Sequence, residues 1–335
     1  MNSEQLEFPL SSPSPDMLSF LFKVLHINDE EMSHAKLKKM SGGITNTVFM
    51  LDSPSKKAII RVFGRNTEKI INREEEQRNI EKVKLIDIYA TLTNGIICSY
   101  QEGRTIDVPM MADPLISHKV AQVIAKMHKV TFYELGHVNC IFDRIQNFID
   151  KIDPEYIHKG EKLDIDSLQH KLDTLKEKLE VEMSTSPIVL CHNDLLSGNI
   201  LWNGSEIGLV DYEYSGYTWP EFDIANHFVE WCGFELDLFR FPNIEKQRQF
   251  IKTYLAQLFG EEPDEDILEQ WVTRVGLLIP LSHLFWGSWG FFQASNSTVQ
   301  FPYFEYAKWR VALMDIQLPL PDGHQLLENQ LVYMS

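Results

Sequence analysis

Three oxygen-bearing side chains follow one another in the middle of the chain at a spacing that suits phosphoryl transfer. Asp194 lies five residues before Asn199, and Asp211 follows the apolar run 207–210. A carboxylate can accept the proton of an attacking hydroxyl, while an amide oxygen and a second carboxylate can hold Mg²⁺ on the phosphates. We therefore expect Asp194 to be the catalytic base, and Asn199 and Asp211 to be the Mg²⁺ ligands beside ATP. The alternative reading of Asp194, a residue that caps a helix or a turn, leaves the positions of the other two unexplained.

The charge of the chain is strongly acidic. Its 335 residues include 31 Lys and Arg and 48 Asp and Glu, for a net charge of −17. Such a surface repels nucleic acid and anionic membranes, so we expect neither as a partner. It suits a small cationic substrate, although ordinary solvation of acidic side chains accounts for most charge of this kind.

The cysteines and the N-terminus favour a cytoplasmic protein. The four cysteines are widely separated and form no C-x-x-C pair, which indicates reduced thiols instead of a disulfide frame or a zinc site. The N-terminus has no basic region and no long apolar run, so we expect no signal peptide and no stable membrane insertion. The cysteines are Cys98, Cys140, Cys191 and Cys232.

Hydrophobic spacing predicts an α+β protein of two lobes. Residues 1–16 are expected to form a flexible tail, 17–103 a small lobe with an antiparallel sheet, and 104–335 a larger, mainly helical lobe, with a hinge near 100–104. Strands are expected over 48–51, 58–63, 88–92 and 96–100. Helices are expected over 17–39, 67–84, 113–130, 141–150, 163–183, 221–233, 243–259, 265–278 and 280–295.

Several segments, taken together and in order, resemble the choline/ethanolamine kinase family. That family has the protein-kinase-like fold of the aminoglycoside phosphotransferases, and the resemblance covers about residues 38–312. It implies a nucleotide-binding N-terminal lobe, a catalytic C-terminal lobe, and an ATP- and Mg²⁺-dependent phosphorylation of an amino alcohol for phospholipid head-group synthesis. The segments that carry the resemblance are 41–46, 191–201, 211–217, 222–231 and 282–289.

The resemblance implies that the N-terminal lobe binds ATP. The small-residue turn 41–46 would cover the phosphates with backbone N–H groups, although such a turn by itself is usually only a turn. Arg61 would replace the phosphate-binding Lys of kinases, with Glu76 as its helix partner; Glu74 and Glu75, or a mere surface ion pair, are the alternatives. The predicted ATP-binding residues are Ser41, Gly42, Gly43, Thr45, Asn46, Arg61, Glu76, the hinge residues Ser99, Tyr100 and Gln101 (or a plain linker), and the clamping Arg104.

The resemblance also implies a pocket for a small cation. Aromatic faces attract ammonium groups, and a carboxylate supplies a full countercharge. Trp286 and Trp289 are three residues apart and would share one face of a helix, where ordinary core packing is the alternative. The predicted substrate-binding residues are Asp194, Tyr214, Glu230, Trp231, Trp286, Trp289, Phe301 and Tyr306.

Other polar residues near the central motif are expected to support it. His192 would brace the catalytic loop as a hydrogen-bonding strut instead of acting as an acid or base, and Asp223 would tie the same loop. His227 is also expected to be structural. Glu213 would be either a second carboxylate beside the metal or a solvent-facing residue.

Within the family, the motifs point to ethanolamine more than to choline. Leu195 and Leu196, together with 212–217 and 88–95, resemble ethanolamine kinases, whereas Glu230-Trp231 resembles choline kinases. Choline kinase or dual activity is therefore the alternative, and a homodimer is left open. A kinase of aminoglycosides, homoserine or sugars is a remoter alternative, against which the two tryptophans argue. A nucleotide-binding pseudokinase is another, against which the intact catalytic triplet argues.

Overall fold

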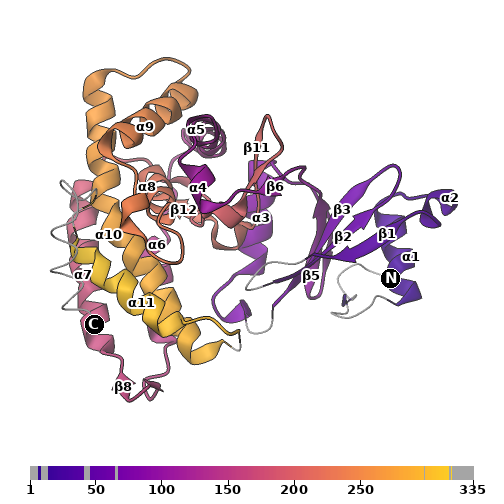
Figure 1. The fold of residues 1–335 in the computed structure, drawn as a ribbon, viewed down its shortest axis with the longest axis horizontal. Helices are drawn as coiled ribbons and strands as arrows, with labels where there is room; N and C mark the ends of the chain where they lie inside the picture. Colours follow the sequence, from indigo (N-terminus) through magenta and orange to yellow (C-terminus); the bar gives the residue numbers. More distant parts are fainter. Residues whose placement is uncertain are drawn as a thin grey trace. The chain divides into compact units, whose positions relative to one another are not determined.

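The computed structural model describes residues 7–8, 14–40, 46–64, 67–297, 299–316 and 318. The chain forms two compact units (Figure 1). The first consists of 1–104 and 201–216, and the second of 105–200 and 217–335. The larger lobe expected from the sequence ran from 104 to the C-terminus without a break, whereas the segment 201–216 clusters with the first unit.

The first unit is built on one antiparallel five-stranded sheet. The hydrogen-bonded order is β1-β2-β3-β5-β4, and residues 49, 51, 58, 60 and 62 of its neighbouring strands β2 and β3 are buried. The alternation along these strands places one face of the sheet in the core. The strands are β1 (Lys36–Lys39), β2 (Asn46–Asp52), β3 (Lys57–Phe63), β4 (Ile88–Leu92) and β5 (Gly95–Ser99).

Three helices accompany this sheet, and their bounds correct one prediction. A single helix was expected over 17–39, but α1 (Pro15–Val24) and the short α2 (Asp29–Met32) end before β1 begins at Lys36. The basic residues of β1 pair with β2, an interaction between distant segments that local helical spacing cannot reveal. The third helix, α3 (Arg73–Val83), follows the short turn η2 (Thr67–Lys69).

Phe8 lies in the core of the first unit, although it falls in the segment expected to be a flexible tail. Its side chain is 1% exposed, and its ring centroid lies 5.1 Å from that of Phe49. Its backbone N–H donates to Oδ1 of Asn94 (2.8 Å), and Nδ2 of Asn94 donates back to its carbonyl (2.9 Å). The tail prediction therefore fails at this residue, and also at the start of α1, because a buried aromatic ring anchors the backbone.

The second unit is mainly helical, and α10 (Glu265–Asn296) is its longest element. This helix packs against α6, α8, α9 and α11. The other helices are α4 (Val108–Met111), α5 (Pro114–Lys129), α6 (Ile141–Asp150), α7 (Ile165–Glu182), α8 (Pro220–Glu230), α9 (Ile244–Phe259) and α11 (Tyr303–Ala312).

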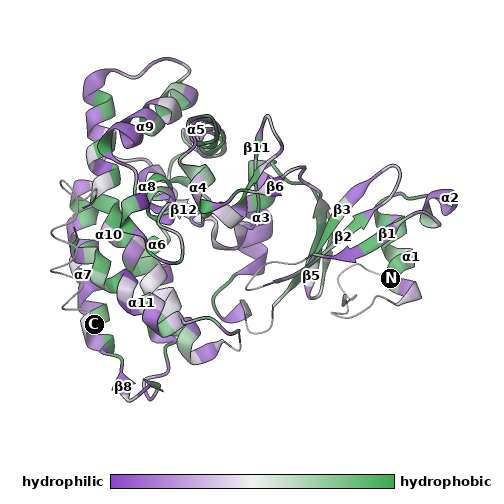
Figure 2. Cartoon of the chain, in the orientation of Figure 1, coloured by the Kyte–Doolittle hydropathy of each residue, from purple (hydrophilic) through white to green (hydrophobic). Residues whose placement is uncertain are grey.

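The length of α10 differs from the prediction of two helices that meet near Pro280. A proline removes one backbone N–H and usually bends or ends a helix, yet here the helix continues through it. Hydrophobic residues run along α10 (Figure 2), and burial on several sides holds the helix together. The helix is long and apolar enough to cross a membrane, but 83% of its most apolar window is buried inside the protein, as in the core helix of a globular unit.

Short strands frame the segment that contains Asp194. β9 (Val189–Cys191) pairs with β12 (Gly216–Thr218), and β11 (Ile207–Leu209), β10 (Ile200–Trp202) and β6 (Arg104–Thr105) form a second small sheet in that order. The segment between β9 and β10 contains Asp194 and the turn η3 (Ser197–Asn199). A further hairpin pairs β7 (Ile157–His158) with β8 (Glu161–Lys162).

Candidate active site

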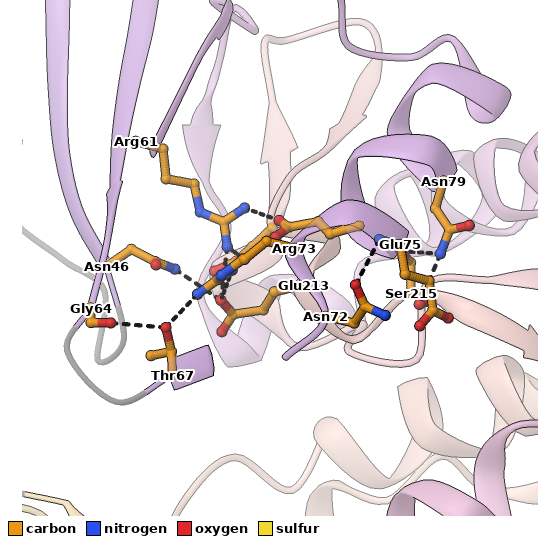
Figure 3. Close-up of polar contacts among 12 residues, drawn as sticks. Asn46, Arg61, Gly64, Thr67, Asn72, Arg73, Glu75, Asn79, Glu213 and Ser215 are labelled. Carbon is orange, nitrogen blue, oxygen red and sulfur yellow. Dashed lines mark hydrogen bonds and ion pairs between the residues drawn. The ribbon is translucent and has the colours of Figure 1, made fainter. Parts of the chain in front are cut away.

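Arg61 is the centre of a charged cluster in the first unit (Figure 3). The residue lies on β3, and its guanidinium contacts the carboxylate of Glu76 on α3. It also donates to Oδ1 of Asp211 (2.6 Å) and to Oε2 of Glu213 (2.8 Å). Of the three glutamates considered as its partner, the structure places Glu76 against it. Gly95 permits the close pairing of β5 with β3 at this residue, because a Cβ there would lie 2.3 Å from the backbone oxygen of Arg61.

Arg73 is a second cation in this cluster, and the sequence did not single it out. Its guanidinium donates to Glu76 (2.8 Å), to Glu213 (3.2 Å) and to the hydroxyl of Thr67 (2.7 Å). It also lies over the ring of Phe63, 4.1 Å from the centroid. The available signal was its place at the start of the helix that carries Glu76, three residues earlier.

The cluster combines three carboxylates with two guanidinium groups. Burial opposes the charge of Arg61, but the three carboxylates outweigh burial and raise its pKa. Burial also raises the pKa of Asp211, while Arg61 lowers it and Glu213 and Glu76 raise it further. The side chain of Asp211 retains 30% of its surface exposed, so water moderates that effect. The excess of one negative charge suits the binding of a cation at Asp211.

Backbone geometry sets Asp211 apart from its neighbours. Its φ angle is 66°, in the left-handed region, directly before the turn η4 (Tyr212–Tyr214). This conformation is uncommon for residues other than glycine, although aspartate adopts it more readily than most, and residues in it are often found at functional sites. Asn79 on α3 helps to hold the turn, because its side chain donates to the backbone oxygen (3.1 Å) and hydroxyl (3.2 Å) of Ser215.

The other residues predicted to bind ATP are placed unevenly. Asn46 joins the cluster through a hydrogen bond from Nδ2 to Glu213 (3.0 Å). Arg104 is exposed on β6. The hinge residues contact their neighbours in the first unit. Ser99 exchanges two hydrogen bonds with Asp87, and the side chain of Gln101 donates to the backbone oxygen of Leu85 (2.6 Å). The ammonium of Lys57 lies over the ring of Tyr100. Ser41, Gly42, Gly43 and Thr45 lie outside the described residues.

Asp223 holds the backbone of the catalytic loop in the second unit. This fully buried residue of α8 accepts from the backbone N–H groups of His192 (2.8 Å) and Asn193 (2.6 Å). Its Oδ2 also contacts Nε2 of His128 on α5 at 2.9 Å. Burial opposes its charge, but His128, His192 and the hydrogen bonds leave its pKa below the usual value. Like Asp211, Asn193 has a φ of 66°, so an ionised carboxylate braces a left-handed turn directly before Asp194.

Asp194 and Asn199 contact each other within the loop. The amide nitrogen of Asn199 donates to Oδ2 of Asp194 (2.8 Å) and to its backbone oxygen (2.9 Å). With its nitrogen turned toward Asp194, the side chain leaves its oxygen, Oδ1, for another partner, and no described residue hydrogen-bonds that atom. An amide oxygen of this kind is a suitable ligand for Mg²⁺.

His227 and Asn226 of α8 support the same region. Nδ1 of His227 lies 3.0 Å from the backbone oxygen of Leu195, and its Nε2 accepts from the indole of Trp231 (3.2 Å). Burial lowers the pKa of His227 to about 4, so the ring stays neutral. Asn226, which the sequence did not single out, accepts at Oδ1 from the indole of Trp286 (2.7 Å). His227 therefore contacts the backbone of the loop at Leu195, and Asn226 contacts it through Nδ2, which donates to the backbone oxygen of Asn193 (3.5 Å).

Glu230 lies at the end of α8. It is the carboxylate that was predicted to bind a small cation together with aromatic side chains. Its Oε1 accepts from Nη1 of Arg310 on α11 (3.0 Å), a cation that the sequence did not single out. Burial raises the pKa of Glu230, while Arg310 lowers it. Burial also raises the pKa of Tyr306, to which the nearby charges of Glu230 and Asp194 contribute. Arg310 also lies 5.6 Å from the centroid of the Tyr306 ring, so the ion pair of Glu230 is next to this tyrosine.

Aromatic rings from α10, α11 and the segment between them gather beside Tyr306. The rings of Trp286 and Trp289 have centroids 5.5 Å apart and are nearly perpendicular. The Tyr306 ring lies 6.5 Å from Trp289 and 5.7 Å from Phe301. The side chains of Trp286, Trp289 and Tyr306 are 5–6% exposed, so the group is closely packed.

Trp231 and Tyr214, two further residues predicted to bind the substrate, are also buried. Trp231 is 3% exposed and contacts His227 and Phe228 of its own helix, with the ammonium of Lys246 5.9 Å from its ring. Trp231 is thus packed in the core of the second unit, and its role in substrate binding stays a prediction. Tyr214 is buried in the turn η4 of the first unit.

A family model for choline/ethanolamine kinases matches residues 37–315, which is most of the chain. The chain belongs to the choline/ethanolamine kinase family. It is accordingly an ATP-dependent phosphotransferase with an alcohol acceptor, as the central motif and the resemblance indicated. The family match covers both compact units, including the Arg61 cluster and the aromatic group.

Individual relatives carry both substrate names. The chain is 30% identical over 295 residues to ethanolamine kinase 1 of Mus musculus, covering 81% of this chain and 80% of the relative. It is 29% identical over 326 residues to probable choline kinase 3 of Arabidopsis thaliana, covering 90% and 93%. The solved ethanolamine kinase of Plasmodium vivax is 24% identical, with a TM-score of 0.75, covering 92% and 96%, and shares the fold. The bilobal kinase-like fold expected from the sequence is therefore confirmed.

Proposed function

We propose that this enzyme transfers the γ-phosphate of ATP to the hydroxyl of ethanolamine and forms phosphoethanolamine. The observation that carries the proposal is the packed group of Trp286, Trp289 and Tyr306, which Arg310 links to Glu230, since its guanidinium binds Glu230 (3.0 Å) and lies 5.6 Å from the centroid of the Tyr306 ring. Aromatic faces and one carboxylate suit an ammonium group at one end of a small substrate. Asp194 suits the hydroxyl at the other end.

Asp194 acts as the base in this proposal. Its carboxylate accepts the hydroxyl proton as the oxygen attacks the γ-phosphate in line. Asp223 and Asn199 hold Asp194 in place from the backbone and the side chain, and such positioning supplies much of the rate in phosphoryl transfer. His192 and His227 complete the support.

The cation expected with ATP is Mg²⁺, and the donor atoms fit it. Asn199 offers a free amide oxygen and Asp211 a carboxylate, both hard ligands that leave other positions for water and phosphate. Bound there, Mg²⁺ would neutralise charge on the phosphates. Arg61 and Arg73 would add positive charge on the nucleotide side, and Glu213 would stay engaged by both arginines instead of facing solvent.

Ethanolamine is preferred over choline for reasons of motif and hydrogen bonding. Leu195 and Leu196 resemble ethanolamine kinases, and a primary ammonium can donate hydrogen bonds that a trimethylammonium cannot. The alternative, choline kinase or dual activity, is favoured by Glu230-Trp231 and by the relatives that carry the choline kinase name. The reduced cysteines and acidic charge favour a cytoplasmic location.

The test is kcat/KM for ethanolamine against choline, with Asp194→Ala as the inactive control. We expect a higher value for ethanolamine, and a fall in kcat of at least ~10³ in the variant while ATP still binds. A strong choline preference would overturn the substrate assignment, and retained turnover in Asp194→Ala would overturn the base. Thermal shift by ATP and Mg²⁺ without turnover of any amino alcohol would instead support a pseudokinase.

A further inference from the structure

Arg310 is the largest fully buried side chain among the described residues, and it contacts Glu230, the proposed partner of the ammonium group. Its side chain is 0% exposed, although arginine is rarely buried without a paired charge. Nη1 donates to Oε1 of Glu230 (3.0 Å), and Nη2 donates to the backbone oxygen (3.3 Å) and hydroxyl (3.4 Å) of Ser282. No described residue hydrogen-bonds the other carboxylate oxygen of Glu230, Oε2.

The contact is built into the packing of two helices. Gly287 and Gly290 of α10 let α11 approach closely. A Cβ at 287 would lie 2.7 Å from Cγ2 of Val311, and one at 290 would lie 3.0 Å from Cβ of Ala307. The approach brings Arg310 within reach of Glu230, which lies 80 residues earlier in the chain.

Ser282 connects Arg310 to the tryptophan of the site. The Ser282 hydroxyl donates to Oδ1 of Asn226 (2.9 Å), the same oxygen that accepts from the indole of Trp286 (2.7 Å). With its proton directed to Asn226, the Ser282 oxygen is left as an acceptor for Arg310. One chain of hydrogen bonds therefore fixes Arg310, Glu230 and Trp286 relative to each other.

We propose that Arg310 is a positioning residue that keeps Glu230 ionised and directs Oε2 of Glu230 to the substrate ammonium. The inference rests on the proposed function, because it assumes that Glu230 receives the ammonium group. A buried carboxyl group favours its neutral form, and a neutral carboxyl group attracts an ammonium only weakly. The guanidinium of Arg310 opposes this preference and occupies one oxygen at 3.0 Å, which leaves the other for the substrate.

The other titratable groups around Glu230 do not supply this charge. His283 on α10 is buried with no described partner at either ring nitrogen, and burial and Arg310 lower its pKa well below the usual value, so it stays neutral. His227 on α8 is also neutral, and burial raises the pKa of Cys232 to about 12. Tyr306 is neutral, because burial raises its pKa, and Asp194 carries a carboxylate of the same sign as Glu230. Within the part of the chain that the structure describes, Arg310 is the one charged group that stabilises the ionised form of Glu230.

The test compares Arg310→Met, Arg310→Lys, Glu230→Gln and the double variant Arg310→Met/Glu230→Gln, with Lys308→Met as an exposed control on the same helix. KM and kcat are measured for ethanolamine, choline and ATP at several pH values below the loss of the ethanolamine proton. Arg310→Met should lower kcat/KM for the amino alcohol about 10- to 100-fold, mainly through KM, with KM for ATP within about twofold. The loss should shrink as pH rises, because Glu230 then ionises without help.

The remaining variants separate positioning from folding. Arg310→Lys keeps the charge and should restore the pH profile of the unmodified enzyme, at reduced kcat/KM. In the Glu230→Gln background, Arg310→Met should cause no further loss, because Arg310 acts through Glu230. The double variant and Arg310→Lys give this comparison even if Arg310→Met does not fold.

Two results would contradict the inference, and they are distinct. If the unmodified enzyme phosphorylates no amino alcohol, the proposed function fails and the role of Arg310 fails with it. If the enzyme is active but Arg310→Met leaves KM for the amino alcohol and its pH profile unchanged, or if its effect persists in full beside Glu230→Gln, only the role of Arg310 is overturned.

Discussion

Asp223 accepts a hydrogen bond of 2.6 Å from the backbone N–H of Asn193, the residue directly before Asp194. The two residues are 30 positions apart in the sequence and both are fully buried. A side chain on α8 thus determines the direction in which the catalytic loop presents its carboxylate. Loss of this contact is expected to affect both the stability and the activity of the enzyme.

Asp223→Asn tests this relationship. The amide would turn an NH₂ group toward one of the backbone N–H groups or toward His128, and it would carry no charge. We expect a loss of about 3 kcal/mol in the free energy of unfolding and a large fall in kcat, measured by urea unfolding and steady-state kinetics. Asp173→Asn, an exposed aspartate on α7 that accepts from Gln169, is the control and should change neither. If kcat were unchanged in a folded Asp223→Asn protein, the contact with Asp223 would not be needed to position the loop.

Arg73→Met should disturb the charged cluster of the first unit. Arg61 alone would then face the carboxylates of Glu76, Asp211 and Glu213, so their mutual repulsion would rise. We expect a destabilisation of about 1–3 kcal/mol and a higher KM for ATP with little change in KM for the amino alcohol. The matched control is Arg78→Met on the same helix, whose guanidinium is 65% exposed and 3.8 Å from Glu74. An equal effect of both substitutions on KM for ATP would exclude a special role for Arg73.

Two glycine-to-alanine substitutions in α10 should change the free energy of unfolding in opposite directions. Gly276 is exposed and a Cβ there would meet nothing within 4 Å, so Gly276→Ala should stabilise the protein by about 0.5–1 kcal/mol through helix propensity. At Gly290 a Cβ would lie 3.0 Å from Cβ of Ala307 and 3.2 Å from the backbone oxygen of Tyr303. Gly290→Ala should therefore cost about 1–3 kcal/mol. Thermal unfolding of the pair measures both, and equal signs would contradict the close packing of α10 and α11.

The neutral His227 should make stability depend on pH. Its pKa is lowered to about 4 in the folded protein against about 6.5 when unfolded, so the unfolded state binds more protons between these values. The stabilisation is complete above pH 6.5 and is lost as pH falls toward 4. Between pH 7 and pH 5 the loss should be roughly 2 kcal/mol for this residue.

His227→Gln should remove that share of the pH dependence, as measured by urea unfolding at the two pH values. Some dependence should remain, because the pKa of His283 is also lowered. His170→Gln, at an exposed position of α7, serves as the control and should leave the pH dependence intact. A variant at 227 with the full pH dependence would show that this ring does not stay neutral in the fold.

Residues in short sequence motifs were predictable, whereas their supports were not. The pairing of Asp194 with Asn199 follows from a five-residue spacing, and that of Arg61 with Glu76 from the arrangement of strand and helix. Arg310 could not be predicted in the same way, because its partner is 80 residues away and nothing in its local sequence distinguishes it from a surface arginine. The role of Asn226 likewise could not be predicted, because its hydrogen bond to Trp286 forms only when α10 packs on α8.

The secondary-structure elements also differ in whether the local sequence or contacts with distant segments determine them. Helical spacing over 265–278 and 280–295 was visible, but the proline at 280 suggested a break that surrounding contacts do not permit. The strand at 36–39 has few apolar residues and forms because β2 offers a partner. Elements whose stability comes from distant packing are the ones that local patterns misjudge.

The burial of Arg310 against Glu230 has an evolutionary consequence. Replacing either residue alone leaves an unpaired charge in the protein interior, whereas exchanging both for apolar residues of similar volume is often tolerated. During evolution, replacement of this residue pair by another pair must therefore pass through a destabilised sequence in which only one of the two residues has changed. Among homologous sequences we expect these two positions to change together, although they lie on different helices far apart in the chain.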